Sequence, residues 1–188
     1  MFLREVAPGI EMRQFRVEDA EPTYTLVDRH RAYLREWLPW VDHTHSPDDV
    51  RDFIQRAGAQ WDANQGPSTV IWMDGAICGS FGCHPIDWTN RNTSIGYWIV
   101  PDLQGKGIVT RCTISMLRYL FDELSLHRVE IRCGTGNMRS CAIPERLGFH
   151  REGVAREAQW VGDRWVDLFI WSMLSEEWRR HPSSRRGV

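Results

Sequence analysis

The residues whose types and spacing most clearly suggest chemistry form the turn Gln104-Gly105-Lys106-Gly107, between an apolar run that ends at Pro101 and a long helical pattern. The first N–H groups of a helix have no partners within the helix and carry the positive end of its dipole. Glycines allow this part of the main chain to approach an anion closely. The pattern therefore favours a phosphate or pyrophosphate ligand. The alternative is a helix start whose glycines serve only the turn.

Two common phosphate-binding motifs do not fit this turn. The P-loop of nucleoside triphosphatases needs G-x-x-x-x-G-K-[ST], and this spacing is absent from the sequence. The dinucleotide fingerprint needs G-x-G-x-x-G at the start of a parallel domain. Here Thr110 stands at the third glycine position, and the preceding strands are expected to be antiparallel. The ligand class must therefore be decided by other residues.

The elements that must position the turn follow from apolar periodicity and from turn signals such as Asp74-Gly75. Their order predicts an α/β fold (an α+β sandwich) with a mixed, mostly antiparallel central sheet. One domain, 1–178, is expected, followed by a polar tail, 179–188, whose arginines (Arg179, Arg180, Arg185 and Arg186) are expected to be solvated. The expected strands are 10–16, 68–73, 76–84, 93–100, 127–133, 149–157 and 164–171, and the expected helices are 18–37, 47–64 (capped by Ser46), 105–124 and 137–146.

Composition and charge exclude several classes of partner. The 188 residues fit one domain, and a net charge of -2 gives no electrostatic reason to expect nucleic acid or an anionic membrane. The sequence lacks the roughly 20 consecutive apolar residues of a membrane helix. Five cysteines without paired spacing and an N-terminus without a signal-peptide pattern predict reduced thiols in the cytoplasm. Asp42, His43 and His45 lack a third partner at ligand spacing, so no metal is expected.

Further segments make the ligand more specific. Residues 97–110 are followed by Asn137-Met138-Arg139-Ser140 and then by 143–149, Ile-Pro-Glu-Arg-Leu-Gly-Phe. Together these motifs resemble the GNAT acetyltransferase superfamily. With residues 34–40, Leu-Arg-Glu-Trp-Leu-Pro-Trp, they look most like its RimJ/RimL branch, which acetylates ribosomal-protein N-termini. The resemblance covers most of the chain, from Ile10 to Trp171.

This resemblance implies a splayed strand pair in the central sheet, helices on both faces, and acetyl-CoA as co-substrate. Gln104 and Gly107 match the pyrophosphate motif Q/R-x-x-G-x-G/A, whereas Val109 replaces its last small residue. The residues implied to hold acetyl-CoA are Trp98, Ile99 and Val100 through their main chain, Gln104, Gly105, Lys106, Gly107, Ile108, Val109 and Thr110 around the pyrophosphate, and Asn137 and Ser140 on the next helix.

Catalytic roles are implied in the same way. Ser140 matches the serine proposed to protonate the leaving thiolate, although Asn137 and Ser140 are also good helix caps. The branch places a carboxylate base where this chain has Gln159, and glutamine cannot usefully accept a proton at neutral pH. Glu157, two residues earlier, would share the face of Gln159 on an extended strand. It is the first substitute as general base, and Asp167 and His84 are further candidates. Cys141 is expected to be a small packing residue.

The acceptor end is expected to include Trp37, Trp40, His84 and Gln159, and the alternative for the two tryptophans is packing of a helix end. The predicted function is direct transfer of acetyl to a primary amine, either a protein N-terminal α-amine or a small amine. An α-amine tolerates a missing base best, because about a tenth of such groups are neutral at pH 7. The alternative, motivated by Gln159, is a non-catalytic acyl-CoA-binding sensor module. A homodimer is compatible with the family.

Overall fold

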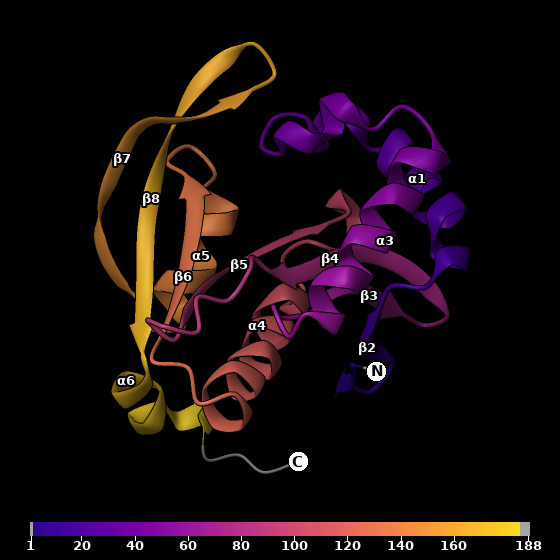
Figure 1. Ribbon diagram of the computed structural model, residues 1–188. Coiled ribbons are helices and arrows are strands. Elements are labelled where there is room, and N and C mark those ends of the chain that lie inside the picture. The colour runs from indigo at the N-terminus through magenta and orange to yellow at the C-terminus, as the bar shows by residue number, and fades with distance from the viewer. Residues whose placement is uncertain (1, 185–188) are drawn as a thin grey trace.

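The computed structural model describes residues 2–184, and over these residues it has an eight-stranded sheet in the order β1-β2-β3-β4-β5-β6-β8-β7 (Figure 1). Neighbouring strands are antiparallel except β5 and β6, which run parallel. The predicted mixed, mostly antiparallel sheet is therefore confirmed. The strands are β1 (Leu3–Ala7), β2 (Ile10–Gln14), β3 (Ser68–Met73), β4 (Ala76–Cys83), β5 (Asn92–Ile99), β6 (Arg128–Gly134), β7 (His150–Val161) and β8 (Arg164–Leu174).

The sheet opens between its two parallel strands. The β5–β6 ladder runs from Asn92 opposite Arg128 to Ile95 opposite Ile131. Past these residues β5 stays paired with β4, while β6 stays paired with β8. In Figure 1, β6, β7, β8 and α5 lie on one side of the molecule and β2 to β4 with α1 and α3 on the other, with β5 between them. This is the splayed pair that the family resemblance implied.

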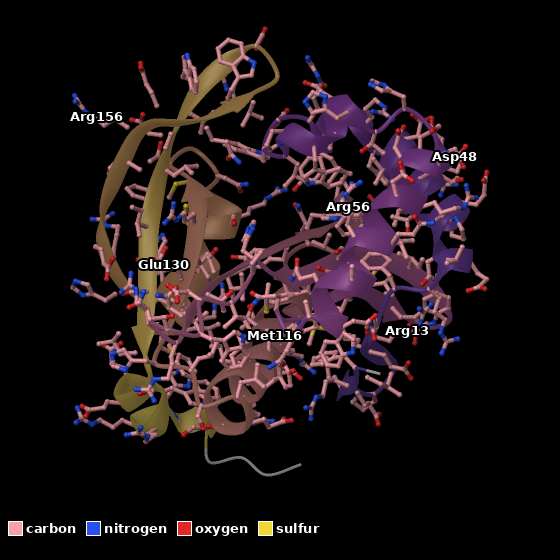
Figure 2. All side chains as sticks on the ribbon, viewed as in Figure 1. Arg13, Asp48, Arg56, Met116, Glu130 and Arg156 are labelled. Carbon is pink, nitrogen blue, oxygen red and sulfur yellow. The ribbon has the colours of Figure 1, made fainter. Side chains whose placement is uncertain are left out.

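Helices cover both faces of the sheet. Successive residues of a strand point to opposite faces, so each face has apolar side chains that pack against helices. Val70 of β3 packs with Ile54 of α3 on one face, whereas Ile71 belongs to the larger core that contains Met116 of α4. Met116 lies centrally in Figure 2 and is fully buried. The helices are α1 (Ala20–Arg29), α2 (Arg31–Leu34), α3 (Pro47–Asp62), α4 (Ile108–Leu117), α5 (Met138–Arg146) and α6 (Ser175–Arg180).

One predicted helix is wrong as a continuous element. The expected helix 18–37 consists of a short 3₁₀ turn, α1 and α2, and the chain leaves helical geometry at His30 (φ -110°, ψ 18°). The guanidinium group of Arg31 donates hydrogen bonds to the carbonyl oxygens of Val41 and Thr44, both at 2.8 Å. These bonds hold the following loop, which includes the 3₁₀ turn Pro39–His43, against the end of α1. Apolar periodicity reports local structure and gives no signal for such distant contacts.

Other boundaries differ less. The cap of α3 is confirmed, since the side chain of Ser46 accepts the N–H of Asp49. The helix predicted from residue 105 begins at Ile108 and continues after α4 as a π-helical turn, Arg118–Glu123. Strand β1 was not predicted, and β7 and β8 are longer than expected.

The expected polar tail, 179–188, begins inside a helix. Arg179 and Arg180 belong to α6, and the guanidinium group of Arg118 donates to the carbonyl oxygen of Ser183 at 2.9 Å. Arg185 and Arg186, which were expected in a solvated tail, lie outside the described residues. Within residues 2–184, no helix is long and apolar enough to span a membrane.

Candidate active site

A cleft of about 360 Å³ lies where β5 and β6 separate. One wall comes from α2 and the loop after it, and the other comes from the start of α4 and from α5. Strand β5 and the glycine turn lie between these walls. The lining residues are Tyr33, Leu34, Trp37, Leu38, Tyr97, Trp98, Ile99, Leu103, Gln104, Gly105, Gly107, Ile108, Val109, Thr110, Asn137, Arg139, Ser140, Ala142, Ile143 and Arg146.

The glycine turn depends on left-handed backbone conformations. Gly105 and Gly107 have φ values of 72° and 75°, and Gly107 is the N-cap of α4. A Cβ atom at either position would meet nothing within 4 Å, so the need for glycine is conformational and the space above the turn is open. The first N–H groups of α4 therefore begin at an open, cleft-facing surface that suits an anion.

Arginine side chains add positive charge beside this helix start. Arg146 of α5 donates to the hydroxyl of Thr110 at 3.2 Å. Arg139 donates to the carbonyl oxygen of the Gln104 side chain, whose amide in turn donates to the hydroxyl of Tyr33. Lys106 is exposed and is not among the residues that line the cleft. Two guanidinium groups and free helix N–H groups together fit the pyrophosphate of acetyl-CoA.

The exposed edge of β5 presents the main chain of alternate residues. The N–H of Val100 donates to the carbonyl oxygen of Cys78 on the β4 side at 2.9 Å, so Val100 and Trp98 direct their main-chain groups towards β4. Tyr97 and Ile99 direct theirs towards the gap between β5 and β6. Of the three residues expected to offer their main chain, only Ile99 therefore faces the gap, together with Tyr97, which was not expected there.

Asn137 and Ser140 come together at the start of α5. The side-chain oxygen of Asn137 accepts the N–H of Ser140 at 3.1 Å, so the expected capping interaction is present. The hydroxyl of Tyr97 donates to the carbonyl oxygen of Ser140 at 3.3 Å. Ser140 lines the cleft, and both its main-chain N–H and its carbonyl oxygen are hydrogen-bonded. Because the capping interaction uses the N–H, it leaves the side-chain hydroxyl available for a chemical role.

Cys141, next to Ser140, has the packing role that was expected. It is buried, and its sulfur lies 3.0 Å from the sulfur of Cys133. Burial, and to a smaller extent the hydrogen bond with Cys141, raises the pKa of the Cys133 thiol and favours its neutral form. Among residues 2–184, no group of three His, Cys, Asp or Glu side chains is arranged to hold a metal ion.

Tryptophans form the end of the cleft away from the glycine turn. The Trp37 ring lies so close to Gly134 that a Cβ atom there would be 3.0 Å from it. The guanidinium group of Arg164 is 5.8 Å from the centre of the Trp37 ring. Trp40 does not line the cleft, but its ring packs against Trp98 with centres 6.0 Å apart. Trp37 therefore lines the cleft, whereas Trp40 is connected to it only through its contact with Trp98.

The face-sharing argument for Glu157 is corrected by the structure. Strand β7 bulges between Ala155 and Gln159, and Glu157 has a φ of 47° instead of an extended conformation. Glu157 is exposed, and its N–H donates to the carboxylate of Asp167 at 2.7 Å. Gln159 pairs with Val166 and is half-buried. The bulge makes residue counting along the strand unreliable for deciding which side chains share a face.

Four residues were considered for proton transfer and acceptor contact, and none of them lines the cleft among residues 2–184: Glu157 and Gln159 of β7, Asp167 of β8, and His84, which directly follows β4. Asp167 holds the β7 bulge through its bond to the Glu157 N–H. His84 is exposed and lies near Gly96, where a Cβ atom would be 3.9 Å from its ring nitrogen. The structure brings together the residues expected around the cofactor more completely than those expected to act as a base.

Several cleft residues were missed by the sequence reasoning. Tyr33 lies four residues before Trp37, and Arg139 and Arg146 are seven residues apart on α5, which places them on one helical face. That spacing was the available signal for the two arginines. Tyr33 had no such signal, because its contact is with Gln104, 71 residues later in the sequence.

Comparisons with known proteins agree with this geometry. A family model described as an acetyltransferase (GNAT) domain matches residues 10–150. The chain is 36% identical over 179 residues to "Putative ribosomal N-acetyltransferase YdaF" of Bacillus subtilis strain 168, covering 95% of this chain and 98% of the relative. It is 22% identical to the ribosomal-protein-serine acetyltransferase of Escherichia coli K12, covering 90% and 95%.

A solved acetyltransferase structure is also similar to this chain. The microcin C7 self-immunity acetyltransferase MccE, in complex with acetyl-CoA and AMP, superposes with a TM-score of 0.85. It is 26% identical, and the match covers 90% of this chain and 94% of that one. The cleft at the splayed strands, the glycine turn before α4 and these similarities lead to one conclusion: the chain belongs to the GNAT acetyltransferase family.

Proposed function

We propose that this chain is an N-acetyltransferase that moves acetyl from acetyl-CoA directly to the N-terminal α-amine of a protein, of the kind named for its ribosomal-protein-acetylating relatives. The observation that carries the proposal is the single cleft that joins the glycine turn, the exposed edge of β5 and Ser140. An anion site, a strand edge and a proton donor are the groups that thioester transfer from acetyl-CoA needs.

Different parts of the cleft bind the pyrophosphate, bind the pantetheine arm and donate the proton. The N–H groups at the start of α4, with Arg139 and Arg146, bind the pyrophosphate. The main-chain groups of Tyr97 and Ile99 bind the pantetheine arm, and an N–H there polarises the thioester carbonyl. The amine nitrogen attacks the carbonyl carbon, the carbon–sulfur bond breaks, and the thiolate takes its proton from the hydroxyl of Ser140. Water that has accepted the amine proton returns a proton to Ser140.

The base is the open step, and the acceptor's own pKa reduces the need for one. An α-amine has a pKa near 8, so about a tenth is neutral at pH 7, whereas a lysine side chain near 10.4 is only about 0.04% neutral. The cleft offers no carboxylate among its described lining residues. We therefore propose that water carries the amine proton away and that α-amines are acetylated in preference to lysines.

Thiol release from acetyl-CoA tests this function directly. We expect release with octapeptides that begin with a free serine or alanine, and none with the same peptides acetylated at the N-terminus but carrying an internal lysine. Ser140→Ala should lower kcat by about a hundredfold or more, since general acids contribute on this scale. Preference for the blocked, lysine-containing peptides would contradict the assignment to α-amines.

The same assay distinguishes acetylation of protein N-termini from two alternatives, a non-catalytic sensor module and an enzyme with another class of acceptor. Saturable binding of acetyl-CoA in calorimetry without release on any amine would favour a sensor module. The AMP in the MccE complex suggests an aminoacyl-nucleotide as a second acceptor to include. Release with an aminoacyl-AMP analogue but not with peptides would replace the protein N-terminus by a nucleotide-linked amine.

A further inference from the structure

A proline lies inside α5, four residues after Ser140. In an α-helix the carbonyl oxygen of each residue accepts the N–H of the fourth residue along the chain. Pro144 occupies that position for Ser140, and proline has no N–H to donate. The helix nevertheless continues past it, because Leu147 donates to the carbonyl oxygen of Ile143 at 3.1 Å. The sequence therefore removes one helical hydrogen bond at Ser140.

A side chain from another element stands at the carbonyl that Pro144 leaves without its helical donor. The hydroxyl of Tyr97 on β5 donates to the Ser140 carbonyl oxygen at 3.3 Å. The Tyr97 ring is stacked on Phe81 of β4, with centres 5.5 Å apart and planes 28° apart. Burial raises the pKa of the Tyr97 hydroxyl, so it stays protonated and remains a donor. The donor is therefore held in place by the sheet.

The bond to Tyr97 connects β5, which lies between the walls of the cleft, to the wall that α5 forms. Tyr97 is on the strand whose main chain faces the gap, and Ser140 is on the helix opposite. The other side of the Ser140 main chain is held by the Asn137 side chain at 3.1 Å. Both ends of the residue are thus fixed, which leaves the Ser140 hydroxyl as the group with freedom to meet the thiolate.

We propose that Tyr97 is a positioning residue for Ser140, and that its hydroxyl replaces the helix N–H that Pro144 lacks. The proposal rests on the function assigned above, in which Ser140 protonates the thiolate. Pro144 contributes to this arrangement, because its missing N–H leaves the Ser140 carbonyl oxygen free to accept from Tyr97. The hydrogen bond then sets the distance between β5, which binds the thioester, and the hydroxyl of Ser140, which donates the proton.

A double-mutant cycle tests the coupling between Tyr97 and Pro144. Tyr97→Phe removes the hydroxyl and keeps the ring, and Pro144→Ala returns an N–H to the helix. In the native background we expect Tyr97→Phe to lower kcat about tenfold with KM for acetyl-CoA nearly unchanged, as small displacements of reacting groups do. In the Pro144→Ala background the same change should lower kcat by less than about threefold, because the helix then holds the carbonyl itself.

Two further variants keep the cycle interpretable. Tyr24→Phe removes another tyrosine hydroxyl that donates to a backbone carbonyl, that of His45 at 2.9 Å, outside the cleft lining, and it should leave kcat unchanged. Pro144→Val also supplies an N–H and fills the site more fully, so it replaces Pro144→Ala if that variant does not fold. The probes are acetyl-CoA and the serine octapeptide of the thiol-release assay.

The outcomes are distinct. Equal losses of kcat from Tyr97→Phe in both backgrounds, or no loss in either, would overturn the proposal. A native enzyme that releases no thiol with any amine would instead overturn the proposed function. In that case urea unfolding decides the geometric part: Tyr97→Phe should lower the midpoint with Pro144 present and leave it unchanged in the Pro144→Ala background, and any other pattern rejects the replacement of the N–H.

Discussion

At the scale of single residues, Gly107 combines a left-handed conformation with a position at the start of α4, facing the cleft. Gly148 has nearly the same φ, 74° against 75°, and also has open space where a Cβ atom would be, but it does not line the cleft. The two glycines therefore make a matched pair for separating backbone strain from cofactor binding.

Replacing each glycine with aspartate should give different results for binding but similar results for folding. Both variants should lose about 1–2 kcal/mol of unfolding free energy, because a side chain in the left-handed region is strained. Gly107→Asp should in addition abolish acetyl-CoA binding in calorimetry, because it puts a carboxylate against the pyrophosphate. Equal affinities for acetyl-CoA in the two variants would remove the turn from the binding site.

Glu157 gives a second prediction at this scale. Its exposed position in the β7 bulge and its absence from the cleft lining lead us to expect that Glu157→Gln changes kcat by less than about twofold, which is far from the effect of losing a general base. Steady-state thiol release measures this, with Gln159→Ala as the comparison on the same strand. A loss of a hundredfold in Glu157→Gln alone would restore it as the base.

These residues show how far the sequence could be followed at the site. Gln104, Gly107, Asn137 and Ser140 converge as expected, because each lies at a helix start or in the turn directly before one, where neighbouring residues determine the local structure. The expectation that Glu157 shares the face of Gln159 is wrong, because a bulge inserts residues without a strong signal in side-chain alternation.

At the scale of elements, one nearly buried ion pair fixes the first helical segment to β2. Arg13 donates two hydrogen bonds, of 2.7 and 2.8 Å, to the carboxylate of Asp19, which also accepts the N–H of Arg16. Figure 2 labels Arg13 on the side of the molecule away from Glu130 of β6. Burial alone would raise the pKa of Asp19, but the bonds from Arg13 and Arg16 hold it below its ordinary value.

Asp19→Asn should therefore lower the unfolding free energy by about 3 kcal/mol near neutral pH, because it leaves the Arg13 charge without its buried partner. Asp28→Asn is the control, since that pair with Arg31 is solvated and should change stability by less than about 0.5 kcal/mol. The lowered pKa of Asp19 means its contribution is present above the ordinary carboxyl range and is lost as pH falls through the folded-state pKa. Urea unfolding from pH 7 down to pH 2 should show the stabilities of the native protein and the Asp19→Asn variant converging at low pH.

The same scale explains which elements were predictable. Strands β3, β4 and β5 and helices α3 and α5 follow from periodicity and caps that lie within each segment. The break at His30 and the loop to Thr44 were missed, because Arg31 binds carbonyls 10 and 13 residues away. Tyr33 follows this break and accepts a hydrogen bond from the side-chain amide of Gln104, a contact between residues far apart in the sequence that periodicity does not indicate.

At the scale of the whole molecule, the cleft separates two parts of the sheet that the β5–β6 ladder joins over the short stretch from Asn92 to Ile95. A ligand that touches the turn, β5 and α5 at once bonds across this boundary. At a concentration of CoA one hundred times its Kd, stability should rise by about 2.7 kcal/mol. For a chain of this size that corresponds to about 5–10 °C in Tm.

Thermal unfolding with and without CoA measures this increase, and the Gly107→Asp variant provides the control without a functional anion site. An unchanged Tm in the native protein at saturating CoA would contradict binding across the two parts. An increase confined to the native protein would place the stabilising contacts at the turn.

The gap beyond Ile95 also gives the sheet an interior edge, with the main-chain groups of Tyr97 and Ile99 directed into it. Edges of this kind recruit any extended chain that offers matching amides, including another copy of the same protein. Bound as proposed, the pantetheine arm, which carries two amides of its own, would pair with this edge and block such recruitment. We therefore expect the protein to self-associate less with acetyl-CoA bound than without it.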